Sequence, residues 1–220
     1  MRCPHNGFVP SETIREPGYL ALARSGELGR RVDLLDGLLA PCRACPWNCG
    51  IDRRRGETKV CVSGYYPIVA SFAPHFGEEP ALSGTCLPPG AARGAGNIFL
   101  GHCNLRCTYC QNADISQDFG AFLRARKAGA QRHGGTAENA GPLAGSGEVS
   151  FERLAGMMLE LQRWGCHNIG FVSPTHFAPQ IVRSVAQAAA LGLDRPLIYN
   201  TNAYDSLEVL RLLDGVFDIY

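Results

Sequence analysis

Seven of the ten cysteines in this 220-residue chain fall into two tight groups. The first group has the spacing C-x2-C-x3-C-x11-C and the second has the spacing C-x3-C-x2-C. Their members are Cys42, Cys45, Cys49 and Cys61 in the first group and Cys103, Cys107 and Cys110 in the second. In a reducing compartment, clustered thiols usually bind a metal ion or an iron–sulfur cluster. Cys3, Cys86 and Cys166 stand alone, and we expect them to act as small apolar side chains.

The second group offers three thiolates on one short loop. Three thiolates can hold three irons of a cubane cluster and leave the fourth iron open to a ligand from outside the protein, whereas clusters are normally held by four cysteines. Zinc is the alternative metal, although zinc sites usually take four ligands. The loop therefore favours an open [4Fe–4S] site.

The first group offers four thiolates within twenty residues, which is a complete tetrahedral set. Its order of spacings is the reverse of that in the second group, and no strand precedes it, so we expect a closed site rather than a second open one. A structural zinc and an auxiliary [4Fe–4S] cluster are both compatible with this pattern.

The two cysteine groups lie in parts of the chain with different expected secondary structure. Residues 1–41 are expected to form a helical lead-in, and residues 42–95 a Cys-rich metal-binding module with a short strand at 69–72. Residues 96–220 then alternate between expected strands at 97–100, 168–172, 196–199 and 216–220 and expected helices at 150–161, 179–191 and 207–213. Repeated strand–helix units predict an α/β fold with a parallel sheet, open or rolled into a barrel, and the second cysteine group follows the first of its strands.

Two segments depart from this alternation. Residues 120–147 contain 7 glycines and 7 alanines, and we expect a flexible insertion there. The expected strand at 216–220 ends the chain without a polar tail, so we interpret the core as a partial (β/α) barrel that is truncated after its fourth strand.

Composition narrows the choice of partners. The formal net charge is only +1, which argues against nucleic acid or an anionic membrane as a partner. No apolar run approaches the ~18 residues of a membrane-spanning helix. The first residues lack the apolar core of a signal peptide, so we expect a cytoplasmic protein.

The segment GHCNLRCTYCQN resembles the signature loop of the radical S-adenosylmethionine (radical SAM) enzymes. The segments CRACPWNCGIDRRRGE, SFAPHFGEEPALSG, NIGFVSPTHFAPQIV and IYNTNAYDSLEVLRLLDGVFDIY are similar to uncharacterised iron–sulfur proteins related to the pyruvate formate-lyase activating enzyme. The resemblance implies a [4Fe–4S] cluster on Cys103, Cys107 and Cys110, with S-adenosylmethionine (SAM) on the open iron.

The resemblance also implies a set of SAM-binding residues. Tyr109 stands at the aromatic position near the adenine, and the loop after the second strand of the expected barrel core is the one that contacts the SAM amino group. The resulting candidates are Tyr109, Ser173, Pro174, Thr175, His176, Asn200, Thr201, Asn202 and Asp218. In place of the family's Gly-Gly-Glu-Pro, the loop here reads Ser-Pro-Thr-His, so backbone carbonyls or Thr175 must make that contact.

By the same resemblance, we expect reductive cleavage of SAM to a 5′-deoxyadenosyl radical, with flavodoxin or ferredoxin as the reductant. The substrate would be a protein that receives a glycyl radical. Two other interpretations remain: a non-catalytic iron–sulfur or zinc protein, and an inactive truncated remnant of an enzyme.

Overall fold

The computed structural model describes residues 16–84, 94–127 and 147–220. Its α-helices are α1 (Gly18–Arg24), α2 (Glu27–Gly37), α3 (Pro80–Ser83), α4 (Ala113–Ser116), α5 (Phe119–Lys127), α6 (Phe151–Arg163), α7 (Ala178–Ala190) and α8 (Leu207–Leu213). Two short 3₁₀ helices are η1 (Arg53–Arg55) and η2 (Thr175–Phe177). The strands are β1 (Val69–His75), β2 (Ala95–Leu100), β3 (Ile169–Val172) and β4 (Leu197–Asn200).

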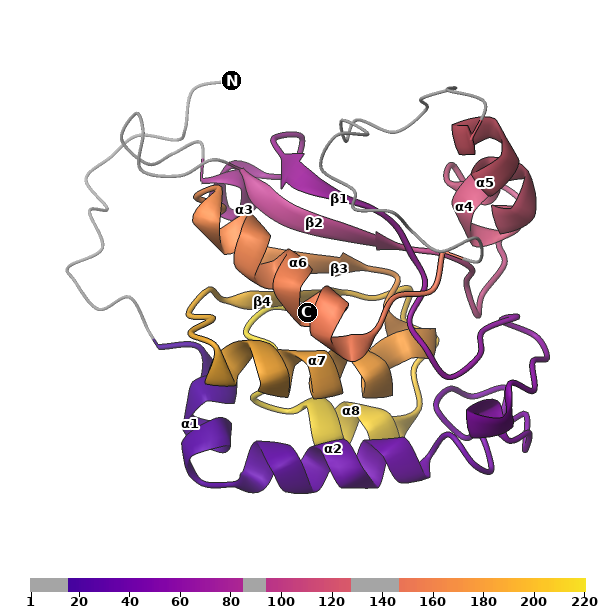
Figure 1. Ribbon diagram of the computed structural model, residues 1–220, viewed down its shortest axis with the longest axis horizontal. Coiled ribbons are helices and arrows are strands. Elements are labelled where there is room, and N and C mark those ends of the chain that lie inside the picture. The colour runs from indigo at the N-terminus through magenta and orange to yellow at the C-terminus, as the bar shows by residue number, and fades with distance from the viewer. Residues whose placement is uncertain (1–15, 85–93, 128–146) are drawn as a thin grey trace.

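The strands form one open sheet in the order β1-β2-β3-β4 (Figure 1). Strands β2, β3 and β4 are parallel, and Phe99, Val172 and Asn200 lie in register near their carboxyl ends. The loops that follow these three strands therefore leave the sheet at one edge. The expected mixed α/β class is confirmed, with a sheet that is not closed.

The strand expected at 69–72 is confirmed as part of a longer strand, β1, which pairs antiparallel with β2 in the main sheet. The strand expected at the end of the chain is wrong. The segment 216–220 forms no extended strand, because its pairing with β4 is a single bridge between Ile198 and Ile219. Both outcomes depend on long-range pairing, which the local pattern does not specify.

Helices α6 and α7 cover one face of the sheet, and α2 packs on the outer side of α7 (Figure 1). Helix α6 begins where the hydroxyl of Ser150 accepts a hydrogen bond from the Arg153 amide at 3.1 Å, as its expected N-cap. The core joins this helix face to the alternate strand residues Ile98, Phe171 and Tyr199. The opposite face of the sheet therefore carries the other strand residues, including Asn97, Gly170 and Asn200.

Truncation of a core side chain on α6 tests this packing. Leu154 is fully buried, so Leu154→Ala should lower the free energy of unfolding by about 2–5 kcal/mol. Leu191 is 69% exposed, and Leu191→Ala should change it by less than about 0.5 kcal/mol. Urea denaturation measures both values, and equal losses would contradict the core assignment.

The first part of the insertion expected at 120–147 is helical. Helix α5 extends through Lys127, and its residue Phe119 is buried, with its ring stacked on that of Phe122 at 5.5 Å. The Gly/Ala content of the whole segment gives no indication that its first residues form a helix, which is held to the core by the rings of Phe119 and Phe122. Residues 128–146 lie outside the described residues.

The first cysteine group follows α2 in a segment with few apolar side chains. A small separate cluster of Leu39, Cys42 and Ala44, with Ile51 and Tyr65 against it, is its only apolar core among the residues that the structure describes. Within those residues, no helix is long and apolar enough to cross a membrane.

Candidate metal and SAM site

The second cysteine group lies in the loop that leaves the carboxyl end of β2. Cys103 is buried and Cys107 and Cys110 are half-buried, and none of the three forms a disulfide. The Cys103 sulfur accepts hydrogen bonds from the Leu105 amide at 3.4 Å and from the Asn202 side-chain amide at 3.6 Å. N–H groups aimed at a sulfur stabilise its thiolate form, which is the form that binds iron.

The other two cysteines are held by the helix that follows. The Cys107 carbonyl accepts a hydrogen bond from the Gln117 side chain at 2.6 Å, and the Cys110 sulfur lies 3.3 Å from the Ser116 hydroxyl. The last residue of α4 and the residue that follows it thus hold the cysteine loop.

Asn104 connects this loop with the loop after β4. Its side chain is fully buried, donates to the Tyr204 carbonyl at 3.0 Å and accepts from the Asn202 amide at 2.9 Å. The Tyr204 amide in turn donates to the side-chain oxygen of Asn202 at 3.0 Å. Asn202, which was predicted from the sequence, therefore lies beside the first cysteine of the loop.

The loop after β3 meets the same edge of the sheet. The Ser173 amide donates to the Asn200 carbonyl at 2.9 Å, while Pro174, Thr175 and His176 are buried. Burial lowers the pKa of His176 to about 3, so the neutral ring donates from Nε2 to the Gly101 carbonyl at 3.0 Å. Of the four predicted residues of this loop, His176 thus contacts the start of the cysteine loop and Ser173 contacts the end of β4.

Thr201 lies in the same region, where its hydroxyl bonds the Asp205 carboxylate. That carboxylate also accepts from the buried hydroxyl of Tyr199 at 2.8 Å. Asp205 therefore holds the turn that carries Thr201 and Asn202, directly after Asn200 at the end of β4.

Tyr109 stands on the cysteine loop itself, between Cys107 and Cys110, with its side chain 85% exposed. One predicted site residue, Asp218, is not brought into this group. Asp218 accepts hydrogen bonds from the Leu197 amide at 2.9 Å and the Gly18 amide at 3.0 Å. Because Leu197 begins β4, Asp218 lies at the amino end of the sheet, away from the cysteine loop, where it links β4 to α1.

The four cysteines of the first group line one small cavity of about 10 Å³, together with Arg53, Lys59 and His176. Burial raises the pKa of the Cys45 thiol to about 11, and the nearby sulfurs of Cys61, Cys42 and Cys49 add to the shift. Among the described residues, no three Cys, His, Asp or Glu side chains are already arranged around a metal position. Metal binding at either cysteine group would therefore require the thiols to lose protons and turn toward one another.

Backbone strain is concentrated in these loops. Six described non-glycine residues have a positive φ: Asn48, Val62, His102, Arg106, Ser173 and Ala203. Each stands in or beside a segment that carries candidate ligands, and such conformations cost about 1–3 kcal/mol each. The surrounding contacts therefore hold the candidate site in a shape that the local sequence does not favour.

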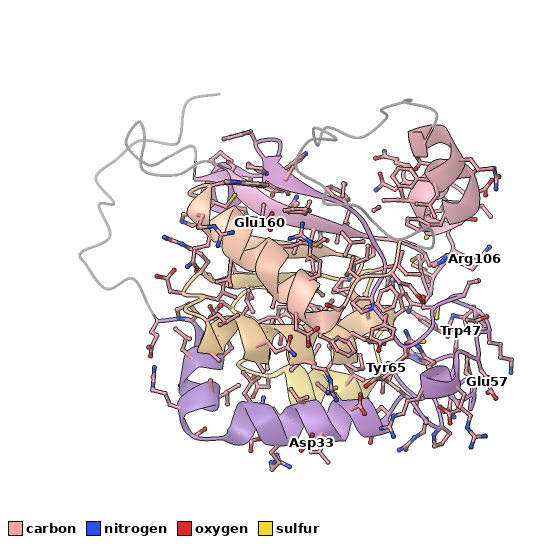
Figure 2. All side chains as sticks on the ribbon, viewed as in Figure 1. Asp33, Trp47, Glu57, Tyr65, Arg106 and Glu160 are labelled. Carbon is pink, nitrogen blue, oxygen red and sulfur yellow. The ribbon has the colours of Figure 1, made fainter. Side chains whose placement is uncertain are left out.

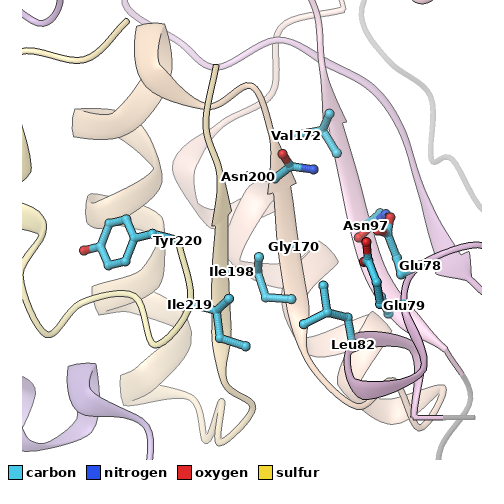
Figure 3. A pocket seen from close by; sticks show the side chains of 11 residues that line it. Glu78, Glu79, Leu82, Asn97, Gly170, Val172, Ile198, Asn200, Ile219 and Tyr220 are labelled. Carbon is cyan, nitrogen blue, oxygen red and sulfur yellow. The ribbon is translucent and has the colours of Figure 1, made fainter. Parts of the chain in front are cut away.

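A cavity of about 250 Å³ opens on the sheet face opposite α6 and α7 (Figure 3). Asn97, Gly170 and Asn200 line it from neighbouring strands, and Glu78 and Glu79 border it from the turn before α3. Glu78 accepts a hydrogen bond from Asn97 at 2.8 Å. The cavity adjoins Asn200, so the candidate SAM-binding edge of the sheet has space beside it.

Sequence reasoning missed several residues of the site. Trp47 donates from its indole to the Asn104 carbonyl at 2.7 Å. Arg53, 1% exposed, donates to the carbonyls of Gly64 and His176 at 2.7 Å. The position of Trp47 between two cysteines was an available signal, whereas nothing in the run Arg53–Arg55 indicates which arginine is buried.

The fold and site define a mixed α/β protein with a three-thiol loop at the carboxyl edge of its parallel strands. The model of the radical SAM superfamily matches residues 97–219, more than half of the chain, and the chain belongs to that superfamily. The chain is also 26% identical over 197 residues to an uncharacterized protein of Methanocaldococcus jannaschii. The match covers 88% of this chain and 48% of that relative, so the chain spans about half its length. No solved structure matches.

Proposed function

We propose that this protein is a radical SAM enzyme in which Cys103, Cys107 and Cys110 hold a [4Fe–4S] cluster for the reductive cleavage of SAM. Membership of the superfamily implies the cluster, SAM and a source of electrons. The observation that supports this proposal most strongly is the contact of the Asn202 amide with the Cys103 sulfur at 3.6 Å. It brings the loops after β2 and β4 together at the edge where ligands bind in parallel sheets.

The donor set fits the proposed cluster. Three thiols without disulfide partners are present on one loop, and three thiolates hold three irons of a cubane and leave the fourth iron open to an outside ligand. Bound by these three cysteines, the cluster would supply one electron for the cleavage of SAM to methionine and a 5′-deoxyadenosyl radical, which is able to take a hydrogen atom from a substrate.

The residues of this chain position and protect the reactants. Leu105 and Asn202 donate to the Cys103 sulfur, and Gln117 holds the Cys107 carbonyl. We assign SAM to the edge formed by Ser173, Pro174, Thr175, His176, Asn200, Thr201 and Asn202, next to Tyr109. The cavity beside Asn200 is our candidate for the substrate site.

A binding measurement tests the proposed SAM site. Anaerobically reconstituted protein should bind about one SAM per chain in equilibrium dialysis, and Asn200→Ala should weaken binding by roughly tenfold, the loss of one charge-assisted hydrogen bond. Cys107→Ala, which lacks the open cluster, should bind SAM more weakly still. Wild-type affinity in both variants would contradict the proposed site.

Two finer assignments extend the proposal. On the resemblance to activating enzymes, we propose that the substrate is a protein that receives a glycyl radical and that flavodoxin or ferredoxin supplies the electron.

We also propose a second metal, zinc or a [4Fe–4S] cluster, at Cys42, Cys45, Cys49 and Cys61, supported by the one cavity that the four thiols share. Metal analysis of a variant without Cys107 distinguishes the two metals.

A further inference from the structure

Trp47 contacts both cysteine groups. It stands between Cys45 and Cys49, and it lines the cavity of the four cysteines. Its indole Nε1 donates to the Asn104 carbonyl at 2.7 Å, next to Cys103. Trp47 and Arg106, one residue from each cysteine segment, lie at the same side of the molecule (Figure 2). One side chain therefore links the two segments directly.

Asn104, whose carbonyl accepts the Trp47 hydrogen bond, is itself held by several hydrogen bonds. Asn104 is fully buried and bonds Asn202 and Tyr204, and Asn202 bonds the Cys103 sulfur. The Trp47 ring also meets the Tyr204 ring edge-on, with centroids 5.9 Å apart. A displacement of Trp47 would thus be transmitted to Cys103 through two contacts.

Arg53 provides a second link between the segments. Its guanidinium donates to the His176 carbonyl at 2.7 Å and lies 5.4 Å from the centre of the Phe177 ring. The His176 ring in turn bonds the carbonyl of Gly101, two residues before Cys103. Arg53 and His176 both line the cavity of the four cysteines.

The four-cysteine cavity suits a single cation held by thiolates. No carboxylate is among the residues that line it, whereas Arg53 and Lys59 bring two positive charges to it. Four thiolates around one Zn²⁺ carry a net charge of −2, which these two cations offset. The cavity of about 10 Å³ has room for roughly one atom, which favours a single ion over a cubane.

Residues 42–61 also need a bound metal ion to hold them in one conformation. Their own apolar cluster contains only Leu39, Cys42 and Ala44 as buried members. A core of this size does not hold a loop of twenty residues, whereas a structural zinc site contributes folding free energy directly.

We propose that Cys42, Cys45, Cys49 and Cys61 bind one Zn²⁺ ion that positions the radical SAM loop through Trp47. The zinc-bound segment fixes the Trp47 indole on the Asn104 carbonyl and thereby holds Cys103 and Asn202 in the arrangement described above. Trp47 is therefore a positioning residue. The inference rests on the proposed function only where it takes the loop of Cys103, Cys107 and Cys110 to be the one that holds the iron–sulfur cluster.

Hydrogen exchange tests the proposal without any cluster. The experiment uses the full chain carrying Cys107→Ala, so that the second cysteine group cannot hold zinc in its place. Addition of ZnCl₂ should load about one zinc per chain and slow amide exchange over 101–112 at least about tenfold, in addition to protecting 42–61. Protection of 42–61 alone, or failure to bind zinc, would overturn the proposal.

Two tryptophan variants separate positioning from a merely structural role. In the same Cys107→Ala background, Trp47→Phe should still bind zinc and protect 42–61 but should lose the added protection of 101–112. Trp164→Phe is the matched control, since the half-buried Trp164 stacks on Phe72 at 5.6 Å against the main core, and it should keep that protection. Equal protection in the two variants would overturn the role of Trp47.

A fluorescence measurement covers the case in which Trp47→Phe does not fold. In Trp164→Phe, Trp47 is the sole tryptophan, and zinc should shift its emission to shorter wavelength as the half-exposed indole becomes fixed on the cysteine loop. An unchanged spectrum on zinc binding would contradict the contact. If the wild-type protein forms no iron–sulfur cluster but these zinc effects are observed, the proposed function fails and this inference stands.

Discussion

Cys107→Ala is expected to remove the iron–sulfur cluster while leaving the metal of the four-cysteine group in place. Loss of one of only three thiolates leaves two ligands, which do not hold a cubane. After anaerobic reconstitution, iron and acid-labile sulfide should fall to less than about a tenth of the wild-type values, whereas zinc should stay near one per chain.

The control for this result is Cys166→Ala. Cys166 is fully buried among the apolar side chains of the main core and belongs to neither cysteine group. Its replacement should leave the iron content unchanged. Full iron content in the Cys107 variant would show that the second cysteine group does not hold the cluster.

Arg53→Met is expected to destabilise the fold far more than replacement of its neighbour Arg54. Arg53 is buried, and its loss leaves the carbonyls of Gly64 and His176 without their donor. One buried and one half-buried acceptor left unsatisfied cost about 2–4 kcal/mol of unfolding free energy in total.

Arg54 forms an exposed ion pair with Asp36 at 2.7 Å, so Arg54→Met should cost no more than about 1 kcal/mol. Urea denaturation of the two variants, with metal content held equal, measures the difference. Equal losses would mean that the Arg53 contacts do not support the junction between the Cys-rich segment and the loop after β3.

The features predicted correctly from the sequence depend on local patterns. The helices α6, α7 and α8 carry strong apolar periodicity, and Ser150 caps α6 as expected. The cysteine loop follows a buried strand, which places it at the carboxyl edge of the sheet, and Asn202 follows another parallel strand of the same sheet. Strand order and direction were enough to bring these residues together.

The features that were missed depend on contacts between distant segments. The antiparallel pairing of β1 with β2 and the burial of Arg53 among three consecutive arginines leave no local signal. Asp218 lies at the amino end of β4, where its carboxylate accepts a hydrogen bond from the Leu197 amide. The indole of Trp47 reaches a residue 57 positions further along the chain, a distance over which spacing carries no information.

The most direct test of the central claim is the formation of 5′-deoxyadenosine from SAM. Reconstituted protein, dithionite and SAM should give 5′-deoxyadenosine in amounts at least comparable to the cluster concentration, and Cys107→Ala should give none above background. A wild-type protein that holds a full complement of iron and sulfide, binds SAM, and yet forms no 5′-deoxyadenosine would contradict the assignment of this chain as a radical SAM enzyme.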